Sequence, residues 1–307
     1  MDSDIKRLTI IICTYNRAKC LESALKSLIK QFGNSNYFEI IVIDNNSQDD
    51  TKNIIKKYLN KLSFLKYIFE PKQGLSYARN RGIKEANSEY IAFLDDDAIT
   101  CPNWVKLAYE IIDFKKPDIF GGPMYPYYED KKPKWYKDDY AIRKVTNKPR
   151  LLKSSEFITA ANIFYKKDIF NKIGLFDVDL GMKGNKVSLG EETQIQLKAD
   201  KQGYKIFYHP NLYINHLVPR FKMKVLYILK RYYAYGYTRR WSNYKKDNIF
   251  FAFAMFIYSI LLGLLRLILY PIRNKTKYPY WQNYFIDKFK SVFIFGALIF
   301  SYIKPPK

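Results

Sequence analysis

Residues 91–100 read IAFLDDDAIT, an apolar stretch that leads directly into three adjacent aspartates, Asp95, Asp96 and Asp97. A short apolar stretch of this kind predicts a buried β-strand, with the aspartates at its carboxyl end. Neighbouring carboxylates repel one another and resist removal from water, so we expect a compensating charge beside them. The residues alone allow two interpretations, because the aspartates can begin a helix or bind a cation.

Similar segments on both sides of this stretch predict the fold. Short apolar strands are predicted over 8–13, 38–44, 64–69 and 90–94, and helices follow them up to about residue 30, from residue 51, over 75–86 and from Pro102. Short apolar strands that alternate with helices are typical of a parallel sheet covered on both faces. We therefore predict an α/β fold with a doubly wound, mostly parallel sheet, whose ligands bind at the carboxyl ends of the strands.

Polar residues stand at the carboxyl ends of three predicted strands, as Thr14–Arg17, Asp44–Ser47 and Asp95–Asp97. Three such groups on one edge of a sheet predict a binding site. Two common phosphate-binding motifs are missing: the sequence contains no GxxxxGK[ST] loop, and no GxGxxG turn follows the first strand. A bound phosphate therefore has to be neutralised by a cation or by side chains such as Arg17 and Arg79. Carboxylates that leave coordination positions to water suit Mg²⁺ or Mn²⁺.

The following part of the sequence is less regular. Residues 121–139 are rich in Gly, Pro and aromatic residues and predict a mobile loop over a site. Further predicted elements are a strand over 156–165, a short helix over 166–174, a helix over 191–203 that begins with Glu191 and Glu192, and an extended segment over 205–216 that ends at His216.

The charge of the chain is unevenly distributed. The 307 residues carry a formal net charge of +23, and residues 220–307 contain 17 Lys and Arg against 2 Asp and Glu. This concentration predicts a separate C-terminal region. The three cysteines show no disulfide or metal-binding spacing, and the N-terminal residues lack the pattern of a signal peptide, so we expect a cytosolic location.

Residues 220–307 predict a helical membrane-anchoring region. Residues 220–247 alternate basic with aromatic or aliphatic residues, a pattern also found in nucleic-acid-binding segments. The next 22 residues, 249–270, contain a single charge and are long enough to cross a bilayer, which argues against nucleic acid as a partner. A second apolar run over 291–303 has 13 residues and is too short to cross easily.

The mode of attachment stays open at this point. Basic residues flank the long apolar run on both sides, whereas a single span concentrates them on the cytosolic side. Interfacial or re-entrant attachment, a hairpin through the second run and a single span are the membrane alternatives. A buried core helix or an oligomer interface is the alternative without a membrane.

Taken in order, the segments resemble family 2 glycosyltransferases with the GT-A fold. The matching segments are IICTYNR, IVIDNNSQD, GLSYARNRG, IAFLDDDA, GLFDVDLG, GEETQIQLKADKQGYKIFYHP and NHLVP, between Leu8 and Pro219. The resemblance implies a GT-A catalytic domain over 1–219, followed by the membrane-anchoring region over 220–307. It also implies an inverting enzyme that uses a nucleotide diphosphate sugar together with Mn²⁺ or Mg²⁺.

The resemblance also implies roles for individual residues. Asp97 and His216 would bind the metal, and Glu192, with Glu191 as the alternative, would act as the general base on the acceptor hydroxyl. Trp135 and Gly122 are placed on the acceptor side, although Trp135 can instead pack the loop. The donor site would contain Thr14, Tyr15, Arg17, Asp44 (on the base), Asn46, Arg79, Asp95 and Asp96, of which Asn46 and Asp96 can instead stabilise their turns.

These observations predict a glycosyltransferase at the cytosolic face of the cell membrane, attached peripherally or as a monotopic protein. A UDP-sugar is the expected donor, and the expected acceptor is lipid-linked or a polysaccharide in cell-surface glycan biosynthesis. One alternative is a nucleotidyltransferase-like enzyme, whose sheet also holds Mg²⁺ on carboxylates. The other is a membrane-bound scaffold with an inactive site.

Overall fold

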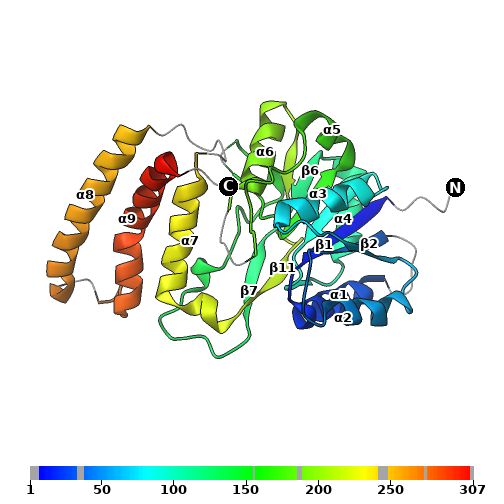
Figure 1. Ribbon diagram of the computed structural model, residues 1–307, viewed down its shortest axis with the longest axis horizontal. Coiled ribbons are helices and arrows are strands. Elements are labelled where there is room, and N and C mark those ends of the chain that lie inside the picture. Colours follow the sequence, from blue (N-terminus) through cyan, green and yellow to red (C-terminus); the bar gives the residue numbers. More distant parts are fainter. Residues whose placement is uncertain are drawn as a thin grey trace. The chain divides into compact units, whose positions relative to one another are not determined.

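The computed structural model describes residues 7–32, 38–154, 156–184, 189–240, 248–272 and 275–304 (Figure 1). Contacts within the chain divide it into two compact units. Unit 1 comprises Met1–Tyr127, Ala141–Val178 and Ile195–Leu217, and unit 2 comprises Tyr128–Tyr140, Asp179–Gln194 and Val218–Lys307. The functional division predicted between residues 219 and 220 remains a prediction.

Unit 1 is built on a large mixed sheet. Its strands are β1 (Leu8–Thr14), β2 (Phe38–Asp44), β3 (Leu65–Phe69), β4 (Tyr90–Leu94), β6 (Ile119–Gly121), β8 (Arg150–Leu151), β9 (Asn162–Lys166) and β10 (Ile206–Tyr208), in the spatial order β3-β2-β1-β4-β9-β6-β10-β8. The first four in this order are parallel neighbours, as are β6 and β10, whereas β9 and β8 run antiparallel to their neighbours. The predicted α/β fold with a mostly parallel sheet is confirmed.

Helices cover both faces of this sheet (Figure 1). They are α1 (Ala18–Phe32), α2 (Thr51–Leu59), α3 (Leu75–Glu85), α4 (Trp104–Lys115), α5 (Phe170–Ile173) and α6 (Glu191–Lys201). Because successive side chains of a strand point to opposite faces, Ile10 of β1 belongs to the core under α1, α2 and α4, and Ile11 to the core under α3, α5 and α6. This two-sided burial explains why the strands read as continuous apolar runs.

One strand is shorter than its sequence suggests. A strand was expected over 156–165, but β9 begins only at Asn162. The reason is a turn at this point, in which the Asn162 N–H donates to the Thr159 carbonyl at 3.1 Å. Glu156 is held before the turn by Arg150, whose two guanidinium nitrogens lie 2.7 Å from its carboxylate oxygens.

A second, three-stranded sheet corrects two expectations. It consists of β5 (Ala98–Thr100), β11 (Ile214–Val218) and β7 (Met124–Tyr128), in the order β5-β11-β7. The helix predicted from Pro102 begins at Trp104, with Asn103 as its N-cap residue, and strand β5 lies between this helix and the aspartates. The three aspartates therefore do not begin a helix. The segment 121–139 was predicted as a mobile loop, but part of it, Met124–Tyr128, forms strand β7.

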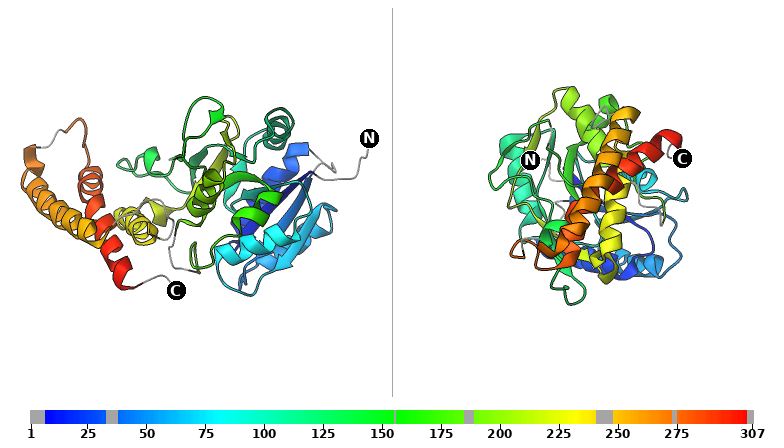
Figure 2. Two further views of the ribbon diagram at one scale, coloured as in Figure 1. Left: turned by 90° about the horizontal axis from the view of Figure 1, so that it is seen from above. Right: turned by 90° about the vertical axis from the view of Figure 1, so that its left-hand side faces the viewer.

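Unit 2 contains three long helices, α7 (Val225–Thr238), α8 (Ile249–Ile268) and α9 (Trp281–Ile303), and α9 lies between the other two (Figures 1 and 2). Two glycines allow the close approach of α9: a Cβ atom on Gly236 of α7 would lie 2.1 Å from the Ile294 carbonyl oxygen, and one on Gly263 of α8 would lie 2.9 Å from the Phe289 ring. The second apolar run was expected to stand alone over 291–303. In the structure it is the second half of the 23-residue α9, because the charges of Asp287, Lys288 and Lys290 interrupt the apolar pattern without ending the helix.

Candidate active site

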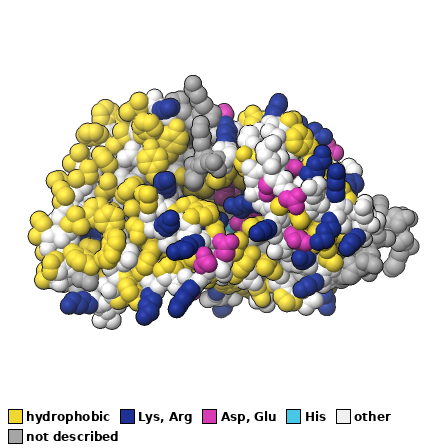
Figure 3. All heavy atoms as spheres, turned by 60° about the horizontal axis from the view of Figure 1, so that its bottom comes forward, with side chains coloured by type: hydrophobic (Ala, Val, Ile, Leu, Met, Phe, Trp, Pro, Cys, Tyr) yellow, Lys and Arg dark blue, Asp and Glu magenta, His cyan; other side chains and the backbone are white. Residues whose placement is uncertain are grey.

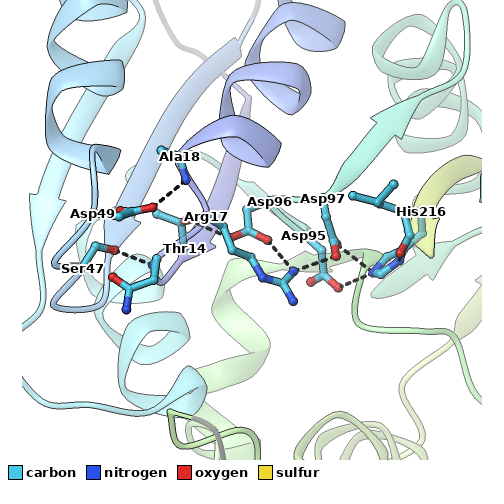
Figure 4. Close-up of polar contacts among 11 residues, drawn as sticks. Thr14, Arg17, Ala18, Ser47, Asp49, Asp95, Asp96, Asp97 and His216 are labelled. Atoms are coloured by element: carbon cyan, nitrogen blue, oxygen red, sulfur yellow. Dashed lines mark hydrogen bonds and ion pairs between the residues drawn. The ribbon is translucent and has the colours of Figure 1, made fainter. Parts of the chain in front are cut away.

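The three aspartates after β4 face cationic and hydroxyl partners (Figure 4). The Thr14 hydroxyl donates to Asp96 Oδ2 at 2.7 Å. Arg17 Nη1 donates to Asp96 Oδ1 at 3.1 Å and to Asp97 Oδ2 at 2.6 Å. Both carboxylates are buried, with Asp97 2% and Asp96 5% exposed, whereas the Arg17 side chain is 39% exposed. Arg17 is thus one source of the compensating charge that the sequence requires.

His216 provides the second cationic partner. Its Nε2 lies 2.9 Å from Asp97 Oδ1 and 3.3 Å from Asp95 Oδ2 (Figure 4). Strand pairing brings it there, because β11 runs antiparallel to β5 with His216 opposite Ala98. The Leu217 N–H also donates to the Asp97 carbonyl at 3.0 Å. The register of these two short strands therefore joins residues that are 119 positions apart in the sequence.

The electrostatics of this cluster are dominated by burial and by mutual charge. Burial lowers the pKa of His216, but the neighbouring Asp97 and Asp95 outweigh this effect and raise that pKa to about 9. Burial raises the pKa of Asp96 to about 7, although Arg17 opposes the shift. Burial also acts to raise the pKa of Asp95, but the hydrogen bond from His216 outweighs it and lowers that pKa. The cluster thus consists of carboxylates held together by adjacent cations.

The ligand atoms of Asp95, Asp97 and His216 fit a divalent cation. All three lie within 4.8 Å of one another, and each residue offers one ligand atom. Two carboxylates and an imidazole are a donor set that Mn²⁺ accepts, and the carboxylates also suit Mg²⁺. Asp97 is buried between a guanidinium and an imidazole, so the site already stabilises positive charge next to this carboxylate.

The loops after β1 and β2 are tied to each other. Asn16 and Asn46 both adopt left-handed backbone conformations, with φ of 53° and 67°. The Asn16 N–H donates to Ser47 Oγ at 3.0 Å, and the Ala18 N–H donates to Asp49 Oδ2 at 3.0 Å (Figure 4). The sequence did not single out Asn16 or Asp49 for this role. Their contacts position the loops that carry Thr14, Tyr15 and Arg17, and Tyr15 is half-buried there.

Two further predicted donor residues are also buried in unit 1. Asp44 Oδ2 accepts a hydrogen bond from the Tyr67 hydroxyl at 3.0 Å, and burial together with Asp44 raises the pKa of Tyr67 to about 12. The Arg79 guanidinium packs between aromatic rings, 5.7 Å from the centre of Phe93 and 5.4 Å from that of Phe176. These contacts fix both side chains, and their roles toward a nucleotide remain predictions.

Glu191 and Glu192 begin α6 and belong to unit 2, whereas the aspartates and His216 belong to unit 1. Glu191 is buried, and Gly190 before it has φ of 109°, a conformation that favours glycine. Further along the helix, the Gln196 side chain pairs with both the N–H and the carbonyl of Ile158 at 2.9 Å. This pairing fixes the helix, and the role of either glutamate as base remains a prediction.

The structure gives both predicted acceptor residues a packing environment. The Trp135 ring lies 5.7 Å from that of Tyr136, and its carbonyl accepts a hydrogen bond from the Asn283 amide at 2.7 Å. A Cβ atom on Gly122 would lie 1.9 Å from the Leu212 carbonyl oxygen, so only glycine fits there. Their roles toward an acceptor remain predictions.

The comparison with a family model decides the family. The model described as "Glycosyl transferase family 2" matches residues 9–174, which is more than half of the 307 residues. The chain belongs to glycosyl transferase family 2. It is a glycosyltransferase, and the matched segment contains Thr14, Arg17 and the three aspartates.

Named relatives of this glycosyltransferase include enzymes from an archaeon and a bacterium. It is 20% identical over 242 residues to the glucosyl-dolichyl phosphate glucuronosyltransferase of Haloferax volcanii, which covers 76% of each chain. It is 39% identical over 93 residues to the GalNAc(5)-diNAcBac-PP-undecaprenol beta-1,3-glucosyltransferase of Campylobacter jejuni, which covers 30% of this chain and 29% of that enzyme. The second alignment thus spans less than a third of its relative.

A solved structure supports the GT-A type of fold. The mannosyltransferase PcManGT of Pyrobaculum calidifontis, in complex with GDP-Man and Mn²⁺, matches with a TM-score of 0.60 at 15% identity. The match covers 97% of this chain and 86% of that one. At this level of identity the likeness concerns the fold.

Arg17→Ala is expected to increase the affinity for Mn²⁺ in the absence of nucleotide, by roughly three- to tenfold, because removing the guanidinium removes a competing cation from Asp97. The measurement is calorimetric titration of the nucleotide-free glycosyltransferase with Mn²⁺. Arg7→Ala is the matched control, since Arg7 Nη1 pairs with Asp113 at 2.7 Å on the exposed surface. Unchanged or weaker Mn²⁺ binding in Arg17→Ala would show that Arg17 does not occupy the cation position.

Proposed function

We propose that this glycosyltransferase transfers a sugar, with inversion at the anomeric carbon, from a nucleotide diphosphate donor to a lipid-linked or polysaccharide acceptor. The observation that carries the proposal is the cluster of Asp95, Asp97 and His216 at the carboxyl edge of a GT-A type sheet. A UDP-sugar is the proposed donor. The names of the two relatives, which contain dolichyl phosphate and PP-undecaprenol, support a lipid-linked acceptor.

The proposed donor site uses the residues at the ends of β1, β2 and β4. Asp97, His216 and Asp95 would hold Mn²⁺ or Mg²⁺, which when bound supplies positive charge to the donor diphosphate. Arg17 is partly exposed and can turn from the aspartates toward the phosphates. The Asp96 carboxylate accepts hydrogen bonds from the Thr14 hydroxyl and from the Arg17 guanidinium, and it thereby positions both side chains. The remaining donor contacts are assigned to Tyr15, Asp44, Asn46 and Arg79.

The proposed base is Glu192, with Glu191 as the alternative. A sugar hydroxyl is a poor nucleophile, and a carboxylate that removes its proton accelerates attack by roughly 10²–10⁴-fold. In a single displacement the acceptor oxygen forms the new bond to the anomeric carbon while the bond to the diphosphate oxygen breaks. The proton passes to the glutamate, the electron pair leaves with the nucleoside diphosphate, and no covalent enzyme intermediate is required.

The alternatives are weaker. A nucleotidyltransferase-like activity lacks support because the family model and the named relatives are those of glycosyltransferases. A scaffold with an inactive site is disfavoured by the geometry, since the acids of Asp95–Asp97 and their cationic partners form a complete cluster. We place the enzyme at the cytosolic face of the cell membrane, attached through residues 220–307.

A thermal-shift panel of UDP-sugars and GDP-sugars, each with Mn²⁺, Mg²⁺ or EDTA, tests this proposal. We expect a rise in melting temperature for at least one UDP-sugar that depends on the divalent metal. The control is the same panel with Asp97→Asn, in which the metal-dependent rise should disappear. A panel without any metal-dependent shift would contradict the proposed donor site.

A further inference from the structure

Helix α8 carries a continuous apolar face that no described residue of unit 2 covers. Figure 3 shows hydrophobic side chains gathered where α8 and α9 lie. The exposed side chains recur at helical spacing from one end of α8 to the other and continue past it. They include Phe250 (83% exposed), Phe253 (57%), Ile257 (43%), Leu261 (62%), Leu264 (53%), Ile268 (75%) and Ile272 (78%).

The opposite face of α8 is the one that packs inside unit 2. Ala252, Ser259 and Gly263 are buried there, and Gly263 meets the Phe289 ring of α9. The small side chains on this face allow α9 to pack closely against it. Only 17% of the most apolar window of α8, whose mean hydropathy is 2.2, is buried. Within the part of the chain that the structure describes, α8 is therefore not a buried core helix, and most of its apolar side chains point outward.

The surroundings of this face favour an anionic lipid surface as its partner. At the C-terminal end of α8 the Arg266 carbonyl accepts a hydrogen bond from Tyr284 at 2.6 Å. The ring of Tyr278 packs 5.2 Å from that of Tyr284 and is surrounded by the ammonium groups of Lys288, Lys277 and Lys137, at 5.3, 5.7 and 6.0 Å. Tyrosine and lysine side chains together are typical of the lipid headgroup region, and basic residues bind anionic headgroups. An acidic protein surface would neutralise the lysines, but it would not bury the apolar face of α8.

The packing of α9 argues against a transmembrane arrangement. Phe289 packs on Gly263, so Asp287, Lys288 and Lys290 lie beside the C-terminal third of α8. At 20 residues, or about 30 Å, α8 only just matches the hydrocarbon thickness, so a crossing would draw these charges into lipid.

Helix α7 adds to the same argument. It covers the apolar half of α9, with Gly236 against the Ile294 carbonyl and the Arg240 guanidinium 3.7 Å from the centre of the Tyr302 ring. A crossing of the α8–α9 pair would therefore carry the basic residues of α7 into the bilayer too. An orientation parallel to the surface keeps all of these charges in water and immerses only the outward face of α8.

We propose that α8 lies parallel to the membrane at the boundary between headgroups and acyl chains of one leaflet, with its outward face in the lipid and the lysines around Tyr278 (Lys137, Lys277 and Lys288) on anionic headgroups. This sharpens the membrane location proposed above, because it selects a monotopic arrangement over a span or hairpin. It does not depend on the donor or on the transfer reaction, since its readout is vesicle binding. A failed transferase assay would leave it intact.

The test is cosedimentation of the full chain with vesicles of phosphatidylcholine alone or with phosphatidylglycerol. We expect binding to the anionic vesicles and a roughly tenfold or greater loss of binding in Leu261→Asp. A matched pair of variants is Phe250→Asp in α8 and Phe114→Asp in α4, because the two side chains are 83% and 81% exposed. Phe250→Asp should lose binding to the vesicles, whereas the control Phe114→Asp should keep it. Circular dichroism checks that each variant is folded.

Depth measurements separate the monotopic arrangement from a span. Cys13 and Cys20 are first replaced by Ala, and a single cysteine that carries a fluorophore is then introduced at Phe250, Ile257, Leu261 or Ile268. The quenching of this fluorophore is measured with lipids brominated at different depths. A surface-parallel helix gives the same shallow depth at all four positions. Deep quenching at Ile257 and Leu261 with shallow ends would overturn the proposal, as would binding that Leu261→Asp leaves unchanged. A dimer formed through this face without vesicle binding would overturn it too.

Discussion

Asp97→Ala is expected to abolish metal-dependent transfer and to lower kcat/KM by at least about 10³-fold, because a bound metal supplies several kcal/mol of charge stabilisation in such reactions. Asp97 is 2% exposed and lies within hydrogen-bond distance of both Arg17 and His216. Its removal leaves these two cations facing each other without the carboxylate. We therefore also expect nucleotide binding to lose its dependence on Mn²⁺.

Two variants keep this prediction testable if the alanine variant folds poorly. Asp97→Asn preserves the shape of the side chain and removes only its charge, and it should show the same loss of activity. Asp113→Ala is the matched control, since Asp113 also binds an arginine, Arg7, but on the surface. Asp97→Asn with the kinetics and metal dependence of the natural protein would exclude Asp97 as a metal ligand.

Glu192→Gln is expected to lower kcat by roughly 10²–10⁴-fold while leaving the dissociation constant of the donor unchanged, because a general base acts only on the acceptor. The amide has the size of the carboxylate but does not accept a proton. Rates at saturating donor and acceptor, together with calorimetric titration of the donor, measure the two quantities separately.

Glu191→Gln decides between the two glutamates. Glu191 is buried at the start of α6, so its replacement is expected to affect stability more than turnover. Glu110→Gln, on the exposed side of α4, controls for the loss of a charge. If Glu192→Gln retained full activity and Glu191→Gln lost it, the base would be Glu191. Full activity in both variants would exclude both glutamates as the general base.

The parallel strands β1, β2, β3 and β4 were predictable because each is a short apolar run next to a helical pattern. Strands β6 and β8 were not predicted, because three and two residues are too few to show a periodicity. The strand β5 was not predictable, because three residues are too few to show a periodicity and its partner β11 comes more than 110 residues later. The pairing of His216 with Ala98 depends on this contact. The resemblance to a family could therefore suggest His216 as a ligand, whereas the residues alone could not.

The environment of the aspartates was also predictable only in part. The sequence predicted a compensating charge beside Asp95–Asp97 but named Arg17 only as a partner for a bound phosphate, whereas in the structure Arg17 pairs with both Asp96 and Asp97. The resemblance placed Asp96 in the donor site or in its own turn, and the structure shows that it joins Thr14 to Arg17. In α9, charged residues in the first half concealed a helix that is continuous in space, because interruptions of an apolar run do not break helical hydrogen bonding.

The release of nucleoside diphosphate from UDP-sugars by the purified protein tests the central claim most directly. The account predicts release with at least one UDP-sugar in the presence of Mn²⁺ or Mg²⁺, none with EDTA, and at most about a thousandth of the rate in Asp97→Asn. No release from any nucleotide sugar with either metal, or the same release with EDTA, would contradict the account.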